Sequence, residues 1–249
     1  MNVRFPRILS GNTLKIIALV SMFIDHFGFM FFPKIKLFRM IGRLAFPIFA
    51  FMISEGAKYT RNKKKYFLSV ALVGVICFLG YLIFSGKVLF SIFTTFTFSL
   101  LMIFSLDSYK AVAFSHDASV NEKITRFIVF ALTVAFSYFF CEIFTVDYGF
   151  IGCATPLTAS LVTSLPKSAP ESLKKLDRIE MRLVLMAIPL IILAVDLKIS
   201  QQYALFSLPI LLLYSEKRGK LNMKYFFYAF YPLHLVILEA VKIALRYIS

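Results

Sequence analysis

The residues of this chain that could do chemistry are titratable groups placed inside apolar runs. Asp25 and His26 are neighbours in the stretch MFIDHFGFMFFP. Arg43 lies in the next apolar run, and His234 interrupts the last one. A charge inside the membrane is costly unless it is paired or hydrated, so such residues are functional-site candidates. Histidine also changes its protonation near neutral pH. We therefore take these four residues as candidate catalytic residues.

The roles of Asp25 and His234 stay open at the level of sequence. Adjacent residues on a helix point about 100° apart, so Asp25 either orients His26 or pairs with Arg43 or Arg39. An ion pair between Asp25 and Arg43 that only locks two helices is the non-catalytic alternative. His234 is either a functional histidine near the middle of the bilayer or a histidine satisfied by the carbonyl that the proline before it leaves free. The sequence does not decide which histidine acts.

A wider set of polar residues is predicted to contact a substrate or donor. It comprises Arg39, Glu55, Arg61, Lys64, Asp147, Tyr148 and Tyr231. For Glu55, a surface ion pair with Lys58 at i+3 is the alternative. For the DYG stretch at 147–149, the alternative is an ordinary turn. The sequence has no Walker loop, no G-x-S-x-G, no G-x-G-x-x-G and no H-E-x-x-H, and we expect no metal.

Composition tells which solvent surrounds these groups. The chain has 59% hydrophobic and 16% charged residues, whereas a soluble domain has about 45–50% and about 25%. Runs of about 20 apolar residues recur, each long enough to cross a hydrocarbon core about 30 Å thick. The sequence therefore predicts an all-α, polytopic integral membrane helix bundle. No small-residue cleavage site follows the first run, so we expect a membrane segment there and not a signal peptide.

Nine candidate spans follow from hydropathy, with eight to ten possible. They cover residues 13–33, 38–56, 66–85, 88–106, 126–145, 149–165, 182–198, 203–214 and 225–245. The runs at 149–165 and 203–214 are short and contain Pro156 and Pro209, so either can be re-entrant or tilted. The sequence has no internal repeat and no low-complexity linker. We therefore expect one transmembrane domain over residues 1–249.

The distribution of Lys and Arg predicts the orientation, because cytoplasmic loops carry an excess of them. With a cytoplasmic N-terminus and nine spans, 20 of the 28 Lys and Arg residues fall in cytoplasmic segments and seven on the opposite side. We expect a multi-pass protein of the bacterial cytoplasmic membrane with a cytoplasmic N-terminus. The net charge of +15 then reflects topology and contact with anionic membrane lipids, and no nucleic acid is needed to explain it.

The first two spans are predicted to bring three of the candidates together. At about 1.5 Å per residue, Asp25 and His26 lie about 10–12 Å below the outer end of their helix. Arg43 lies about 7 Å below the outer end of the next helix, which is antiparallel to the first. On the second helix, three- and four-residue spacing predicts one shared face for Arg39, Arg43, Pro47, Ala50 and Ser54. Charges at such depth are costly unless paired or hydrated, which makes these residues functional candidates.

Four stretches resemble the TraX family of integral membrane proteins. They are LKIIALVSMFIDHFGFMFF, RMIGRLAFPIFAFMISEGAKYTRNKKKYF, DYGFIG and FYAFYPLHLVIL, in matching order from about residue 13 to the C-terminus. TraX acetylates the N-terminus of conjugative pilin, and the family is related to acyltransferase-3 type membrane enzymes with a histidine in the first membrane helix. The resemblance thus implies an O- or N-acetyltransferase. Its donor would be acetyl-CoA or another acyl-CoA in the cytoplasm, and its acceptor a surface polymer, a lipid-linked molecule or a peptide.

Acyl transfer needs a base for the acceptor's proton and a cation or hydrogen-bond donor for the oxyanion. Under this resemblance His26 would be the base and Arg43 the oxyanion or phosphate partner, and His234 would be a second proton carrier or would relay the acyl group.

Other residues and two other function classes complete the expectations. The basic turn from Lys58 to Lys65 is expected to receive the phosphates of CoA.

A proton-coupled transporter or flippase would also need Asp, His and Arg in the membrane, but many such folds show inverted repeats, which are absent here. A non-catalytic membrane assembly factor would need none of these groups. Binding or hydrolysis of acetyl-CoA separates the three classes.

Overall fold

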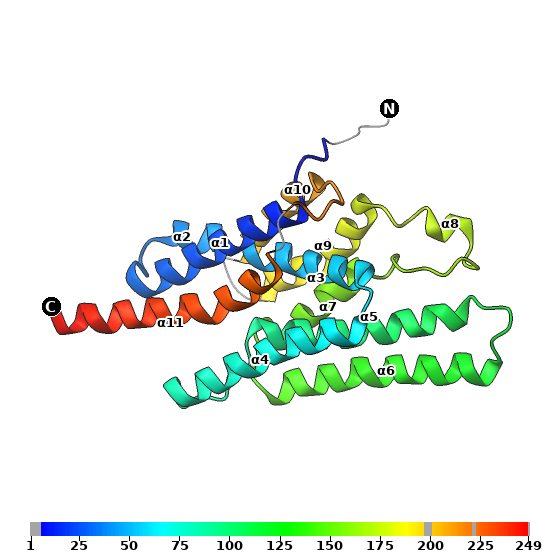
Figure 1. Cartoon of the computed structure of the whole chain (residues 1–249), viewed down its shortest axis with the longest axis horizontal. Helices are drawn as coiled ribbons and strands as arrows, with labels where there is room; N and C mark the ends of the chain where they lie inside the picture. Colours follow the sequence, from blue (N-terminus) through cyan, green and yellow to red (C-terminus); the bar gives the residue numbers. More distant parts are fainter. Residues whose placement is uncertain (1–5, 197–200, 221–222, 249) are drawn as a thin grey trace. The chain divides into compact units, whose positions relative to one another are not determined.

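Figure 1 shows a computed structural model of the chain, which describes residues 6–196, 201–220 and 223–248. The longer helices are α1 (Gly11–Phe31), α3 (Ala45–Tyr59), α4 (Lys63–Ser85), α5 (Ile92–Ala113), α6 (Val120–Ile143), α9 (Ile179–Asp196) and α11 (Lys224–Ile248). The shorter ones are α2 (Lys36–Gly42), α7 (Gly149–Ala159), α8 (Glu171–Lys174), the 3-10 helix η1 (Gln201–Phe206) and α10 (Ser207–Leu212). Within the described ranges the regular elements are all helices, so the predicted all-α class is confirmed.

Six helical segments of the described chain are long and apolar enough to cross a membrane. They are Gly11–Phe31, Lys36–Tyr59, Lys63–Phe84, Ile92–Ala113, Val120–Ile143 and Phe226–Leu245. The chain is therefore a polytopic helical membrane protein.

Three of the nine predicted spans fall outside this set, and the number of crossings stays a prediction. The run 149–165 holds an 11-residue helix that ends at Ala159. The run 203–214 holds part of η1 and the six-residue α10. The run 182–198 corresponds to α9, whose 18 residues include Glu180, Arg182 and Asp196. The end of this last run, and the basic residues Arg4 and Lys198 of the charge partition, lie outside the described residues.

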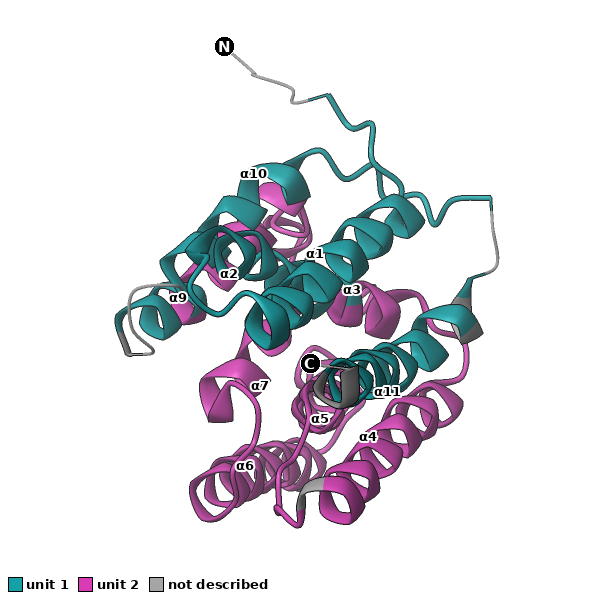
Figure 2. Cartoon of the chain, turned by 90° about the vertical axis from the view of Figure 1, so that its left-hand side faces the viewer, with its two compact units in different colours: residues 1–52, 190–249 teal, residues 53–189 magenta. Residues whose placement is uncertain are grey.

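The chain divides into two compact units, teal and magenta in Figure 2. Residues 1–52 and 190–249 form unit 1, and residues 53–189 form unit 2. α3 and α9 each continue from one unit into the other. The expectation of a single transmembrane domain stays a prediction. Each unit is described by itself below.

In unit 1, α1 packs against α2 and α11. Two glycines allow the close approach of α1 and α2. A Cβ on Gly28 would overlap the ring of Phe38, and one on Gly42 would overlap the side chain of Asp25. α1 begins where the segment after α10 meets it, because Gly11 N–H donates to the carbonyl of Lys217 at 2.8 Å. Such contacts satisfy amide groups that the first turn of a helix leaves free.

The second predicted span, 38–56, is interrupted by two turn residues, Arg43 and Leu44. α2 ends at Gly42, and α3 begins at Ala45. Pro47 explains the break, because it has no N–H for the carbonyl of Arg43 and its ring clashes with that carbonyl. Lys36–Tyr59 together still form one apolar segment that is long enough to cross a membrane. The shared face of Arg39, Arg43 and Ser54 extends across this interruption and stays a prediction.

In unit 2, α5 packs against α4, α6 and α7. α4 ends at Ser85, and the chain turns toward α5 at Gly86, whose φ of 65° is left-handed. Glycine adopts this conformation without strain and commonly ends helices. α6 buries little of its surface, and among its side chains Ser137 is the one classed as buried. An apolar helix that is this exposed suits a lipid environment.

Candidate functional site

A pair of histidines from the two ends of the chain forms the centre of the site in unit 1. His26 on α1 and His234 on α11 lie 2.8 Å apart, measured from Nδ1 to Nε2. Their ring centroids are 4.9 Å apart. On its other side, His234 Nδ1 lies 3.0 Å from the carbonyl oxygen of Phe230. The two candidates that the sequence left as alternatives are thus direct partners.

The hydrogen bonds define the tautomer of each neutral ring. A carbonyl oxygen only accepts, so Nδ1 of His234 carries the proton and donates it to Phe230. Nε2 of His234 then has a lone pair and accepts from Nδ1–H of His26. The remaining lone pair of His26 is therefore on Nε2, for which the described part of the chain provides no hydrogen-bond partner. A histidine with a free lone pair and an orienting partner is the arrangement of a general base.

Aromatic side chains of α11 hold His234 in place. The ring of Phe230 stacks on it at 5.2 Å, and the ring of Tyr231 meets it edge-on at 5.5 Å. His234 is 2% exposed. The carbonyl that binds His234 belongs to Phe230. It is not that of Tyr228, the residue four positions before Pro232, to which the proline has no N–H to donate. Tyr231, predicted as a binding residue, forms part of the wall around the histidine pair.

Asp25 does not orient His26, because its partner is Arg39. Arg39 Nη1 donates to Asp25 Oδ2 at 2.8 Å. Of the partners that the sequence left open for Asp25, the structure shows Arg39. The other oxygen, Oδ1, is buried against Gly42 and finds no hydrogen-bond donor among the described residues. Arg39 also lies over the ring of Phe29 at 5.3 Å. The Arg39 side chain of α2 therefore contacts two residues of α1, Asp25 and Phe29.

Arg43 is the second charged group of the site. It is 8% exposed, and its Nε–H has no acceptor among the described residues. Its charge is close enough to act on both Asp25 and His26. Buried donors are normally satisfied, and each exception needs an explanation. A guanidinium donor of this kind is suited to an oxygen of a substrate that carries or develops negative charge.

Glu55 is buried in unit 2, contrary to the predicted surface pair with Lys58. The residue is 2% exposed and pairs with Arg182, which is 1% exposed. Lys58 instead pairs with Asp177 at 2.8 Å. The surface interpretation failed because Glu55 lies inside α3, on the side that packs into unit 2, while the actual partner comes from α9.

Sequence reasoning missed the buried cations of unit 2. Arg182 Nε donates to the carbonyl of Ala159 at 3.1 Å. Lys110 Nζ donates to the carbonyls of Ser160 and Thr163 at 2.8 and 3.0 Å. Both cations therefore satisfy carbonyls at the end of α7, where a helix leaves such groups unpaired and partially negative. The available signal was their position beside apolar runs, because Arg182 begins the predicted span 182–198 and Lys110 follows the span 88–106 by one helical turn.

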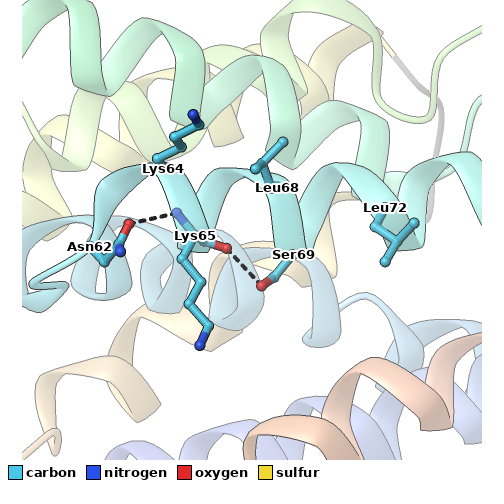
Figure 3. A pocket seen from close by; sticks show the side chains of 6 residues that line it. All are labelled: Asn62, Lys64, Lys65, Leu68, Ser69 and Leu72. Atoms are coloured by element: carbon cyan, nitrogen blue, oxygen red, sulfur yellow. Dashed lines mark hydrogen bonds between the residues drawn. The ribbon is translucent and has the colours of Figure 1, made fainter.

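Arg61 and Lys64 lie in an exposed basic turn at the start of α4. A surface hollow of about 340 Å³ is lined by Asn62, Lys64, Lys65, Leu68, Ser69 and Leu72 (Figure 3). Arg61, Lys64 and Lys65 are exposed, and among the described residues they form no ion pair. Lys63 differs, because it binds Asp107 at 2.8 Å. The turn thus contains both a structural lysine and cations that face solvent.

Asp147 and Tyr148 form a turn that is docked on the start of α5. The amide of Asp147 donates to the carbonyl of Phe90 at 3.0 Å, and its carbonyl accepts from Thr95 Oγ1 at 2.6 Å. Burial raises the pKa of the Asp147 carboxyl to about 6, partly offset by the hydrogen bond from the Ile92 amide. Tyr148 has a left-handed φ of 63° just before α7. The structure thus contains the ordinary turn, and a substrate contact stays a prediction.

Comparison with known proteins gives two curated relatives and one family. The family model described as TraX protein matches residues 10–242, which include both histidines of the pair. The "Probable fimbrial assembly protein FimC, serogroup H1" of Dichelobacter nodosus is 28% identical over 254 residues, 95% of this chain and 97% of that protein. The uncharacterized protein RP591 of Rickettsia prowazekii (strain Madrid E) is 42% identical over 40 residues, 16% of each chain. No solved structure matches this chain.

Proposed function

The chain belongs to the TraX protein family, and from this premise we propose that it is a membrane assembly factor for a surface structure that works by acyl transfer at His26. The name of the Dichelobacter nodosus relative, a fimbrial assembly protein, supports the assembly role. The single observation that supports the chemical step is the oriented histidine pair, which leaves Nε2 of His26 with a free lone pair. We place the protein in the bacterial cytoplasmic membrane with a cytoplasmic N-terminus.

The proposed reaction uses an acyl-CoA donor and an amine or hydroxyl acceptor. Nε2 of His26 takes the acceptor's proton as the acceptor attacks the thioester carbonyl. The positive charge that develops on His26 is stabilised by Nε2 of His234, which accepts from its Nδ1–H. The carbon–sulfur bond then breaks, and the CoA thiolate leaves with the proton from His26. The Nε–H of Arg43 donates to the oxyanion of the tetrahedral intermediate.

Asp25 and Arg39 position the site and do not react. Their ion pair joins α1 to α2 one residue before His26 in the sequence. The pair therefore sets the rotation of α1 relative to α2, and with it the direction of the His26 ring. Arg43 follows α2 directly, so the same contact also sets where its guanidinium lies.

Release of CoA from acetyl-CoA by the purified protein in detergent tests the chemical step. We expect His26→Ala to lower the rate by about 10²–10⁴-fold, the usual contribution of a general base. His116→Ala, which changes an exposed histidine of the loop between α5 and α6, is the matched control and should keep the wild-type rate. Loss of less than about threefold in His26→Ala, far below that range, would refute His26 as the base.

A non-catalytic assembly factor is the second candidate, favoured by the name of the relative alone. It predicts no CoA release by the wild-type protein and unchanged assembly of the surface structure in cells that carry His26→Ala. The acyl-transfer proposal predicts the opposite in both measurements. Equal amounts of wild-type and variant protein in the membrane must be verified by immunoblotting before the two are compared.

A further inference from the structure

Two cysteines of unit 2 that are separate in the sequence meet between α6 and α7. Cys141 lies two residues before the end of α6, and Cys153 lies in the second turn of α7. Their sulfur atoms are 3.8 Å apart, and both are free thiols. Cys153 is fully buried, whereas Cys141 is partly exposed. We propose that Cys141 and Cys153 are a thiol pair that is oxidised to a disulfide and thereby fixes α7 to α6.

The position of the pair suits this reaction. Cys141 lies about 3 Å below the end of its helix at the usual rise per residue, so a reagent in the aqueous phase can reach it. In the orientation proposed above, this end of α6 faces the outside of the cytoplasmic membrane, the oxidising side on which disulfides persist. Cys77 lies on α4, and among the described residues its sulfur forms no contact with the other two.

The reaction is a thiol–disulfide exchange with an oxidant that itself contains a disulfide. The thiolate of Cys141 attacks one sulfur of that oxidant and releases its other sulfur as a thiol. The thiolate of Cys153 then attacks the sulfur of Cys141, and the second oxidant sulfur leaves as a thiol. Two electrons and two protons pass from the cysteines to the oxidant. Cys141 acts first because it is the more exposed thiol, and Cys153 resolves the mixed disulfide.

The bond would close the loop that contains the outer turn. Between the two cysteines lie Asp147 and Tyr148, and the φ angles of Tyr148 and Gly149 are both positive. At its far end, α7 is already held by Arg182 and Lys110. Oxidation would therefore fasten the near end of a short helix whose other end is fixed by buried cations.

The test uses the full chain in detergent, with oxidised glutathione as the probe. After denaturation, a maleimide reagent of known mass counts the free thiols. We expect three labelled cysteines in reduced wild-type protein and one, Cys77, after oxidation. Cys77→Ser should lose both remaining thiols together, which shows that the pair forms without Cys77. Three free thiols in oxidised wild-type protein, or a disulfide that contains Cys77, would overturn the proposal.

Single substitutions test the order of the two steps. Cys153→Ser should trap glutathione on Cys141, which mass spectrometry detects as one adduct. Cys141→Ser should react at least tenfold more slowly, because the buried thiol of Cys153 is left alone. Equal adduct formation in both variants would contradict the assigned roles. None of these thiol measurements depends on acetyl-CoA. Failure of the disulfide proposal can therefore be distinguished from failure of the proposed acyl transfer.

Discussion

At the scale of single residues, the histidine pair assigns unequal roles to its members. His26 has the free Nε2, while both nitrogens of His234 are engaged by Phe230 and His26. His234 is thus a positioning residue for the base. This inequality is the basis of the first prediction.

His234→Ala should lower CoA release less than His26→Ala does. The variant keeps the nitrogen that takes the proton but loses the group that orients the ring and stabilises its charge. We expect a loss between that of the exposed control and the roughly 10²–10⁴-fold loss of the base. Rates from acetyl-CoA for the two variants check this order. An inactive His234→Ala beside an active His26→Ala would assign the base to α11.

The carboxyl of Asp147 predicts a pH dependence of stability. Its pKa in the folded chain is raised to about 6 from an ordinary value of 3.8, because burial disfavours the charged form. The folded state therefore binds this proton more tightly than the unfolded state. The contribution to stability is fully present below pH 4 or so and is lost as the pH rises through about 6.

Thermal unfolding at pH 5 and pH 7.5 measures this contribution. We expect the melting temperature of wild-type protein to fall more over this interval than that of Asp147→Asn, which cannot ionise. The Asn variant keeps an acceptor for the Ile92 amide. Identical pH profiles for the two proteins would show that Asp147 does not titrate in this window.

At the scale of the elements, the contact of α1 with α2 depends on glycine. Gly42→Ala would place a methyl group in the volume of the Asp25 side chain, so α2 must shift or the ion pair with Arg39 must break. We expect a lower melting temperature and a loss of CoA release. Gly80→Ala in α4 is the control, because nothing lies within 4 Å of its added Cβ. That variant should be as stable as wild type or more so, since alanine is the better helix former.

The basic turn before and at the start of α4 divides into structural and exposed cations. Lys63 binds Asp107, so its replacement would change the stability of the fold as well as donor binding. A test of donor binding should therefore neutralise the three exposed cations, namely Arg61, Lys64 and Lys65, and keep Lys63. We expect weaker binding of CoA and a smaller dependence of affinity on salt, because its phosphates lose charged partners. Isothermal titration at two salt concentrations measures both.

A matched set of exposed lysines controls for net charge. It consists of Lys34, Lys36 and Lys87, which are also exposed and lie on the side predicted to be external. Their neutralisation should leave CoA affinity unchanged. Equal effects of both sets would indicate attraction by overall charge, and no effect of either would place the phosphates elsewhere.

At the scale of the whole molecule, topology is the prediction that links the site to its compartments. Single cysteines at Lys64 and Thr145, in a protein without its native cysteines, should react with an impermeant maleimide from opposite sides of the membrane. Intact cells and inverted vesicles provide the two directions. Labelling of both sites from one side would contradict the orientation with a cytoplasmic N-terminus and the external position of Cys141.

Local properties of this chain were determined by its sequence. The membrane helices are predictable because an apolar stretch of about 20 residues is sufficient to span a bilayer, wherever it lies in the chain. The stretches around His26 and His234 also sufficed to predict the TraX family, which the match over residues 10–242 confirms. An ionisable group inside such a helix needs a partner, which is why these residues could be selected as candidates.

Only the tertiary structure decided which partner each group has. His26 contacts His234, which lies 208 residues later in the sequence. Glu55 contacts Arg182, which lies 127 residues later. Asp25 pairs with Arg39 and not with Arg43, although both arginines follow it at similar distances along the chain. Spacing along one helix predicts neighbours on that helix alone. Pairing between helices depends on distance in space, which is set by packing, as at Gly28 and Gly42.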